Sequence, residues 1–426
     1  MASVRKLLLV ALGALAVNGE PLWADGVIRD GLGAISSGRG GTNLGFSDNG
    51  EILLDNPAAM TNVAGNGLFE VGGDLLFTDL KYSDPDNGRV DAHDNPMPMG
   101  QIALIRKSQD GLWAYGLGLY SQAGFSSVYD MNGPFPISGE QRYKSFGSLA
   151  RILPGVSAKL TDRLSVGGTF GAAISHMEVE APYYLQGPHP FAGTPTLMDF
   201  QGTGAAISWS VGAQYLLSDR TTLGVSYTGE TNFHLDGNTL VSVPGLGTTR
   251  FDSTLDVEWP SILGAGLRHV VSPCLVLSTD VYWMGWSSSF DSFDLNLTRA
   301  DNPAIAALTG PSLVDRFPLN WKDSVSLRLG LERSLAGDRV LRAGYVYHDN
   351  PIPAGTLTPL IAATLEHAVS VGAGQTWGCY QFDVAYQFSW SGEKTVGQSD
   401  FLGGDFSNSN VSTQAHWLMG SVVRRF

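Results

Sequence analysis

Along most of the chain, apolar and polar residues alternate with a period of two instead of gathering into blocks. Residues 325–332 are the clearest example, because apolar residues occupy the odd positions and polar or small residues the even ones. Successive side chains of a β-strand point to opposite faces, so this pattern predicts strands with one apolar face. Such segments follow one another from Leu68 to the last residue. The chain is therefore predicted to be all-β.

The connections between these segments alternate between long and short. About fourteen segments are predicted, at 67–82, 99–107, 111–122, 141–160, 163–180, 203–217, 220–232, 248–271, 274–290, 321–335, 338–349, 364–376, 379–390 and 410–426. The long connections are 83–98, 123–140, 181–202, 233–247, 291–320, 350–363 and 391–409. Outer-membrane barrels have short periplasmic turns and long outer loops, whereas a Greek-key sandwich has no reason for this rhythm. It predicts a transmembrane antiparallel up-and-down β-barrel of about 14 strands.

Two further features refine this prediction. Trp and Tyr residues near segment ends suit the aromatic girdles of a membrane barrel; they are Tyr82, Trp113, Tyr115, Trp283, Trp286, Trp321, Tyr345, Tyr347, Trp377, Tyr380, Trp390 and Trp417. Pro260 lies inside the segment 248–271, and because proline cannot donate a ladder hydrogen bond, a bulge or break is expected there. The alternative is two strands that meet at a turn.

Composition agrees with a barrel and excludes other classes. The 426 residues include 53 Gly, 43% are hydrophobic and 15% are charged. The apolar residues nowhere form the run of ~20 that a transmembrane helix needs, and low charge with many aromatics is the opposite of a disordered composition. The net charge of −14 makes nucleic acid an unsuitable partner, because binding it requires many Lys and Arg on phosphates.

The amino terminus has the order of a secretory signal peptide. Arg5 and Lys6 precede the apolar stretch 7–17, and small residues follow near Ala24. The alternative is a buried N-terminal helix. Residues 1–24 are therefore predicted to be a signal peptide, 25–66 a separate N-terminal segment and 67–426 the barrel.

The reactive side chains do not suggest an enzyme. Cys274 and Cys379 both lie beside short turns, four strands apart, which exceeds the reach of a disulfide, so two free thiols are expected. The eight His show no metal-ligand spacing, and no catalytic set can be assembled from strand positions. No cofactor is implied.

Residues 25–66 are rich in Gly and Ser and are not strand-like. Their glycine run lacks the preceding strand and the Lys of a phosphate-binding loop. A barrel of about fourteen strands has a lumen wider than side chains can fill, so a compact plug inside it is expected. The alternative is a flexible exported tail.

Several motifs in this chain are similar to those of one known family. They are Gly-Leu-Gly-x4-Gly-Arg-Gly-Gly at 31–41, Asn56-Pro57-Ala58, Trp321-Lys322-Asp323-Ser324 and the stretch 341–353 that ends in Asp-Asn-Pro-Ile-Pro. Together they resemble the FadL-type transporters of long-chain fatty acids and their relatives that take up aromatic hydrocarbons. The likeness covers essentially the whole mature chain.

This resemblance implies a 14-stranded barrel closed by an N-terminal hatch, whose characteristic residues here are Gly33, Gly38, Gly40, Asn56, Pro57 and Ala58. It also implies an inward kink in the third strand, near Ser121 and Gly124, through which ligand leaves sideways into the membrane. The alternative at this position is an ordinary strand end.

The resemblance further implies an outer capture groove between the loops 181–202 and 233–247. Its apolar candidates are Tyr183, Tyr184, Leu185, Phe191, Leu197, Leu240, Val241, Val243 and Leu246. Lys322 matches the head-group Lys of the family, and His176 stands at the position of its Arg. Arg328 and Arg342 face the predicted lumen and are further head-group candidates.

The expected function is passive uptake across the outer membrane of a Gram-negative bacterium, with long-chain fatty acids as ligand or, alternatively, aromatic or aliphatic hydrocarbons. General porin, adhesin, and outer-membrane protease or lipase remain the alternatives. The expected partners are hydrophobic small molecules, outer-membrane lipids and the assembly machinery, which reads a terminal strand ending here in Phe426. A monomer is expected.

Overall fold

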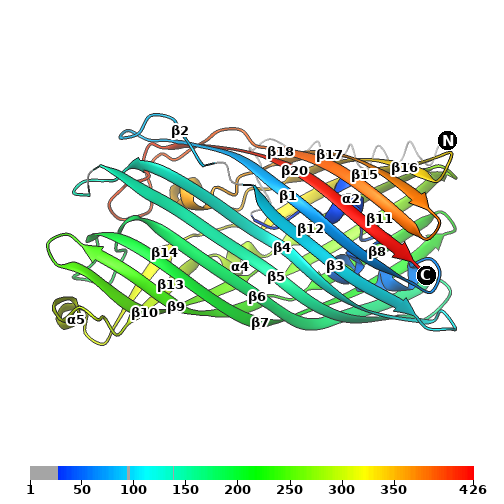
Figure 1. Cartoon of the computed structure of the whole chain (residues 1–426), viewed down its shortest axis with the longest axis horizontal. Helices are drawn as coiled ribbons and strands as arrows, with labels where there is room; N and C mark the ends of the chain where they lie inside the picture. Colours follow the sequence, from blue (N-terminus) through cyan, green and yellow to red (C-terminus); the bar gives the residue numbers. More distant parts are fainter. Residues whose placement is uncertain (1–26, 94–95, 138) are drawn as a thin grey trace.

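The computed structural model describes residues 27–93, 96–137 and 139–426. The predicted signal peptide, residues 1–24, lies outside this part. The described chain forms a closed antiparallel barrel of 14 crossing strands (Figure 1). They are β1 (Gly67–Ser83), β3 (Met97–Lys107), β4 (Trp113–Asn132), β5 (Glu140–Lys159), β6 (Leu164–Tyr184), β7 (Pro195–Ser218), β8 (Thr221–Thr228) continued by β9 (Thr231–Val243), β10 (Gly247–Trp259) continued by β11 (Ile262–Ser272), β12 (Leu275–Met284) continued by β13 (Ser292–Thr298), β14 (Ser312–Pro318) continued by β15 (Ser324–Leu335), β16 (Arg339–His348), β17 (His367–Trp377), β18 (Tyr380–Trp390) and β20 (Asn410–Arg425).

The first and last strands close the barrel. β1 pairs with β20 without interruption from Leu68↔Arg425 to Ser83↔Asn410. This closure pairs the first strand with the last, so that neither presents an unpaired edge to lipid, as the bilayer requires of a β-structure. The all-β fold and its up-and-down topology are thus confirmed.

Pro260 produces the break expected of it. β10 ends at Trp259 and β11 begins at Ile262. The neighbouring strand is broken at the same level, so that β10 pairs with β9 and β11 pairs with β8. The two breaks lie side by side, and the segment 248–271 is one crossing strand, as predicted.

The short turns lie where the sequence places them, but the strands run further outward than predicted. The segment 233–247 is not a loop, because β9 and β10 continue through it and meet at a tight turn where Val243 pairs with Gly247. The segment 291–320 similarly holds β13, β14 and the helix α5 (Pro303–Thr309). These extensions form the end of the barrel that carries α5 and β2 (Val90–Asp91) in Figure 1. The alternation of apolar and polar residues continues through these extensions beyond the membrane. Only the length of the two segments therefore predicted loops.

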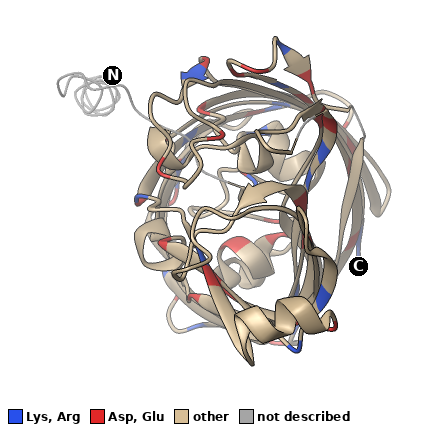
Figure 2. Ribbon diagram, turned by 90° about the vertical axis from the view of Figure 1, so that its left-hand side faces the viewer, with Lys and Arg blue, Asp and Glu red and all other residues tan. Residues whose placement is uncertain are grey.

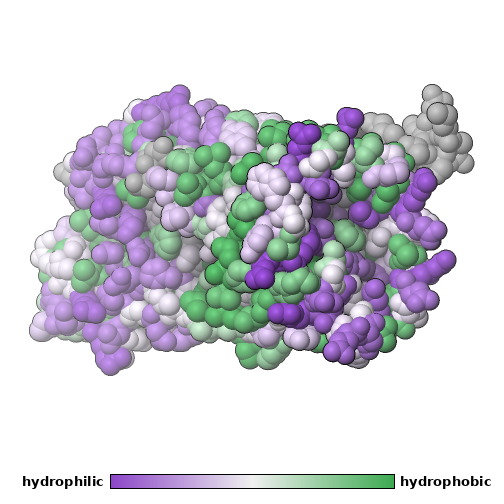
Figure 3. Space-filling view, turned by 45° about the vertical axis from the view of Figure 1, so that its right-hand side comes forward, coloured by the Kyte–Doolittle hydropathy of each residue, from purple (hydrophilic) through white to green (hydrophobic). Residues whose placement is uncertain are grey.

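The outer face is apolar over the centre of the barrel, as Figure 3 displays for one side. On β15, Val325 and Leu329 are each 41% exposed, whereas Ser326 and Arg328 between them are buried. Alternating side chains therefore point to lipid and to the lumen, as the period of two predicts.

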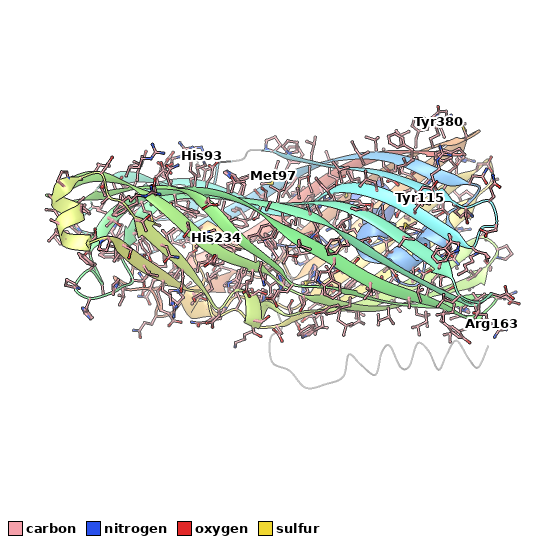
Figure 4. The ribbon with its side chains drawn as sticks, turned by 90° about the horizontal axis from the view of Figure 1, so that it is seen from below. His93, Met97, Tyr115, Arg163, His234 and Tyr380 are labelled. Carbon is pink, nitrogen blue, oxygen red and sulfur yellow. The ribbon has the colours of Figure 1, made fainter. Side chains whose placement is uncertain are left out.

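The aromatic girdle is confirmed in part. Trp113, Tyr115, Trp377 and Tyr380 are exposed, and Figure 4 places Tyr115 and Tyr380 toward the end that also carries Arg163 in a short turn. The prediction is wrong for Tyr82, Trp286 and Trp321, which are buried, and for Trp417, which lines an internal cavity. A strand end has two faces, and sequence spacing near an end does not say which one an aromatic occupies.

Residues 27–66 lie inside the barrel and are almost entirely buried. They contain the short helices α2 (Gly33–Gly38) and α3 (Ile52–Asp55) and the 3-10 helix η1 (Pro57–Asn62). α2 packs against β16, β17, β18 and β20, whereas η1 packs against β5, β6 and β7 on another part of the wall. A segment that touches these separate strands of a closed barrel must lie within its lumen. In the described residues, no helix is both long and apolar enough to cross a membrane.

Cys274 and Cys379 are both exposed free thiols. They lie in the turns between β11 and β12 and between β17 and β18, at one rim of the barrel. The prediction of two free thiols is confirmed.

Candidate functional site

Residues of the amino-terminal segment 27–66, the predicted hatch, are bound by carboxylates that project from the barrel wall. Asp74 of β1 forms an ion pair with Arg29, with 2.5 Å between Oδ2 and Nη2. Asp280 of β12 accepts hydrogen bonds from the backbone N–H groups of Asn43 and Leu44, at 2.8 and 2.9 Å. Glu70 of β1 accepts one from Gly50 N–H at 2.6 Å. The segment has little regular structure, so wall carboxylates satisfy backbone donors that would otherwise be buried without partners.

The predicted hatch motifs have specific structural roles. The Asn56 side chain accepts a hydrogen bond from Ala58 N–H and so caps η1, with Pro57 at its first position. Gly40 has a φ of +67°, and an added Cβ would lie 3.0 Å from the backbone oxygen of Leu329. Only glycine combines this left-handed backbone with such a close approach to the wall. Gly33 and Gly38 are likewise buried at the wall.

The outer part of the lumen contains an apolar cavity of about 90 Å³, called the outer cavity here. Its walls are mostly aromatic and aliphatic, and Tyr183 stacks on Phe317 with 4.6 Å between the ring centroids. Trp321 belongs to a neighbouring cluster in which its ring centroid lies 4.7 Å from that of Phe290. The outer cavity is lined by residues that include Phe125, Phe146, Met177, Met198, Phe200, Leu255, Phe293, Leu295, Leu319, Ile352, Leu360, Ile361, Phe401 and Phe406.

A second cavity of about 130 Å³, the inner cavity, lies between the outer cavity and the hatch. Most of its lining is apolar, including Leu76, Leu80, Val128, Leu365 and Trp417. Phe125 and Leu360 line both cavities. The two spaces therefore adjoin at these two side chains.

A buried carboxylate stands at the hatch end of the inner cavity. Asp30 lies 3.0 Å from His348 through Oδ1 and Nε2, and its Oδ2 accepts a hydrogen bond from Gln387 Nε2 at 3.0 Å. Burial alone would raise the pKa of Asp30, but the neighbouring His348 and Arg328 outweigh it and hold that pKa below its usual value. Asp30 is therefore ionised at neutral pH.

The wall beside the inner cavity is interrupted at the third strand. β3 and β4 pair from Lys107↔Ala114 to Gln101↔Tyr120 and, within the described residues, no further. On its other side β4 pairs with β5, with a register shift between Ser121 and Ala123. Ile28 forms a β-bridge with Ala123 where β3 has left the strand. His93 N–H also donates to Val128 O, at 2.8 Å; Figure 4 shows His93 and Met97 close together in the outer half of the molecule.

The predicted head-group residues are not brought together. Arg328 is buried, donates to the backbone oxygen of Asp30 and lies over the Tyr282 ring. Arg342 binds Glu332 and Asp383, at 2.8 and 2.6 Å. Both face the lumen, as predicted, but neither belongs to the lining of either cavity.

Lys322 and His176 lie elsewhere. Lys322 is exposed. His176 shares a face of β6 with the exposed Ile174, opposite the buried Ser175 and Met177, and it contacts Thr203 and Glu178. It therefore points away from the lumen in which the resemblance would place a head-group residue.

The candidates for an outer groove are divided between two faces. Tyr183, Leu185 and Val241 are buried in the lumen, and Phe191 packs against the same core. Leu240 and Leu246 are exposed, and Tyr184 donates from its hydroxyl to Phe135 O. β9 pairs with β7, with Val241 opposite Met198, so a continuous sheet stands where two facing loops were expected.

Sequence reasoning missed Asp30, Gln387, Phe125 and Leu360. His348 belongs to the motif at 341–353, and Asp30 directly precedes the glycine run, so both lie beside a local sequence signal. Nothing in the sequence joins them, because Asp30 and His348 are more than 300 positions apart. Among the described residues, no group of three or more His, Cys, Asp or Glu is arranged to hold a metal ion.

A closed barrel with an apolar outer belt and its own amino-terminal segment in the lumen belongs to the class of plugged outer-membrane barrels. Residues 29–426 match the family described as outer membrane protein transport protein (OMPP1/FadL/TodX), and the chain belongs to this family. It is therefore an outer-membrane transport protein. No curated protein matched the chain.

Solved structures share the fold at low sequence identity. A FadL homologue of Pseudomonas aeruginosa is 17% identical, with 94% of this chain and 99% of that chain covered and a TM-score of 0.77. The toluene transporter TodX of P. putida is 20% identical, with 93% and 99% covered and a TM-score of 0.78. The toluene transporter TbuX of Ralstonia pickettii is 19% identical, with the same coverage and a TM-score of 0.74.

Proposed function

We propose that the protein is a passive, monomeric uptake channel for neutral hydrophobic compounds, with aromatic hydrocarbons favoured over long-chain fatty acids. The lining of the two cavities carries this proposal. Aromatic and aliphatic side chains dominate both, and such walls bind apolar molecules by burial and dispersion without a charged anchor.

A fatty-acid carboxylate lacks a suitable cation in these cavities. Burying a carboxylate without a counter-charge or hydrogen bonds is expensive. Of the described residues that line the cavities, Arg29 alone is a Lys or Arg, and Asp74 already binds its guanidinium. The polar end of the inner cavity instead carries the carboxylate of Asp30, which repels a second anion. A neutral ligand avoids both costs.

The proposed route has three stages. Ligand is captured in the outer cavity, passes Phe125 and Leu360 into the inner cavity, and leaves sideways between β3 and β4 after the hatch residues rearrange. The interrupted β3–β4 pairing near Ser121 and Gly124 supports a lateral exit at this point. The single bridge between Ile28 and Ala123 is a weaker closure than a continuous strand pair.

Two relatives support the preference for aromatic compounds, since TodX and TbuX are toluene transporters. Long-chain fatty acids are the second candidate. The arrangement of the two cavities in series favours them, because an extended chain could occupy both.

Uptake of labelled toluene and labelled oleate by cells expressing the protein, in a host without its own channel of this kind, tests the proposal. Toluene uptake several-fold above the vector control, with weaker oleate uptake, is the expected result. Faster oleate than toluene uptake would replace the neutral ligand by a fatty acid. Uptake of neither compound, or a large steady ion conductance in planar bilayers, would contradict a hydrophobic uptake channel.

A further inference from the structure

The connection between β16 and β17, residues 349–366, folds into the lumen instead of remaining outside. It contains the 3-10 helices η2 (Ala354–Thr356) and η3 (Pro359–Ile361), and Ile352, Leu357 and Thr364 are buried. Figure 2, viewed from the outer end, shows several connections folded across the mouth of the barrel. Loops usually stay on the surface because their backbone groups need partners, so a connection inside the lumen requires a specific reason.

Hydroxyl groups of the wall supply those partners. Ser127 Oγ of β4 donates to Pro359 O at 3.0 Å, and Ser145 Oγ of β5 donates to Leu360 O. The two serine oxygens lie 3.0 Å apart. On the other side, Thr413 Oγ1 of β20 donates to Ala362 O at 3.1 Å. The connection is thus held across the lumen between β20 and the strands β4 and β5.

The same short stretch separates the two cavities. Ile352, Thr356, Thr358 and Ile361 line the outer cavity. Ala362, Ala363 and Leu365 line the inner cavity. Leu360 lines both, and Phe125 of β4 is the other residue that does so. The two cavities therefore adjoin at these two side chains.

We propose that residues 349–366 form an internal gate, in which Leu360 and Phe125 are the gate residues and the Ser127–Ser145 pair is a latch. This inference rests on the proposed uptake function. The latch holds the backbone carbonyls of Pro359 and Leu360, and through them positions the Leu360 side chain against Phe125. Each of these neutral hydrogen bonds is worth about a fivefold shift in an opening equilibrium.

The latch and the interrupted wall lie on one strand. Ser127 and Phe125 follow the register shift between Ser121 and Ala123 on β4. Beyond Tyr120 this strand has no β3 partner in the described residues. The Ile28–Ala123 bridge and the His93–Val128 hydrogen bond stand on that side in place of a continuous ladder, so the strand can move more freely than one that is fully paired on both sides. Release of the latch therefore admits ligand to the inner cavity directly beside the proposed exit.

Variants of the full chain in the toluene uptake assay test the gate. Combined Ser127→Ala and Ser145→Ala should raise the uptake rate about fivefold or more, while equilibrium toluene binding by the purified protein stays within about twofold. Ser145→Thr, which retains a hydroxyl, should leave uptake at the wild-type rate. Leu360→Trp should lower uptake at least about tenfold by filling the passage.

The matched control is Thr169→Ala with Ser210→Ala, which removes another buried cross-strand hydroxyl pair, 2.6 Å apart, away from residues 349–366. It should leave the uptake rate unchanged. Unchanged or reduced uptake in the latch variant, or wild-type uptake in Leu360→Trp, would overturn the gate. Absence of uptake in the wild type would instead overturn the proposed function.

Discussion

The two ends of the lumen are built on opposite physical principles. Near the short turns, the hatch is joined to the wall by directional polar contacts, such as Arg29 with Asp74 and the Asn43 N–H group with Asp280. Toward the outer end, stacked and tilted aromatic rings such as Tyr183 and Phe317 enclose an apolar space.

The difference separates two tasks. Directional hydrogen bonds hold the hatch in one position, because a shifted segment would leave buried polar groups without partners. Apolar walls have no such preference and accept ligands of varied shape. The hatch therefore closes the lumen in one defined position, whereas the outer cavity can bind ligands of different shapes. Four changes should break or sharpen this contrast.

The largest effect is expected at the Arg29–Asp74 pair. Arg29→Ala leaves the carboxylate of Asp74 buried without its counter-charge, which costs about 3–5 kcal/mol. The hatch residues around 27–31 should undock, with hydrogen exchange accelerated more than about a hundredfold there. Exchange measured by mass spectrometry on the solubilised protein would detect this.

The control for this change is Arg316→Ala. Arg316 pairs with Asp294 at the same 2.5 Å, but its side chain is 68% exposed, so the loss should be at most about 1 kcal/mol. Equal protection of residues 27–31 in wild type and Arg29→Ala would contradict the view that polar contacts hold the hatch.

Changes in the outer cavity should alter the affinity for ligand and leave the position of the hatch unchanged. Phe317→Ala removes the stacking partner of Tyr183 and part of the apolar wall, and aromatic pairs contribute about 0.5–1.5 kcal/mol beyond their buried area. Toluene affinity should fall about tenfold, as measured by equilibrium binding. Phe135→Ala, at a side chain that is 88% exposed, should change nothing. A loss of affinity in both variants would mean that binding is not confined to the outer cavity.

The polar end of the inner cavity should decide between ligand classes. Asp30→Asn removes the anion that repels a fatty-acid carboxylate, so oleate uptake should rise about fivefold relative to toluene uptake. Asp219→Asn, in a short turn, is the comparison and should leave the ratio unchanged. A ratio unaffected by Asp30→Asn would show that no head group reaches this end.

The smallest effect is expected from pH. Burial and the neighbouring Glu70 and Asp55 carboxylates raise the pKa of Glu51 well above its usual value, and burial raises the pKa of Asp55 to about 6. Both acids bind protons more strongly in the docked hatch than in a released one, so docking should strengthen as pH falls from about 8 to about 5.

Exchange of the amides of residues 33–62, corrected for the intrinsic rate, would measure this dependence. Protection should increase a few-fold at the lower pH, and Glu51→Gln should remove most of the change. Stronger protection at the higher pH would reverse the sign and contradict the assignment of these carboxyls.

Much of the fold was predictable because its signals are local. The period of two on β15 assigned Val325 and Arg328 to opposite faces, and the alternating connection lengths indicated an up-and-down barrel. Pro260 marked a break for a reason contained in one residue. Connection length wrongly predicted a loop at 233–247. The strand pairing between β7 and β9 continues there beyond the membrane and keeps the same alternation of side chains.

The sequence by itself determined a membrane barrel, its approximate strand number, its free thiols and the family it belongs to, since each depends on periodicity, spacing or local motifs. Only the tertiary structure decided which side chains meet in the lumen. Asp30 reaches His348, and Phe125 and Leu360 line the same two cavities, although each pair is far apart along the chain. Barrel closure brings together residues whose separation along the chain carries no trace of their contact, and it turned His176 outward while burying Arg328 and Arg342 in the lumen.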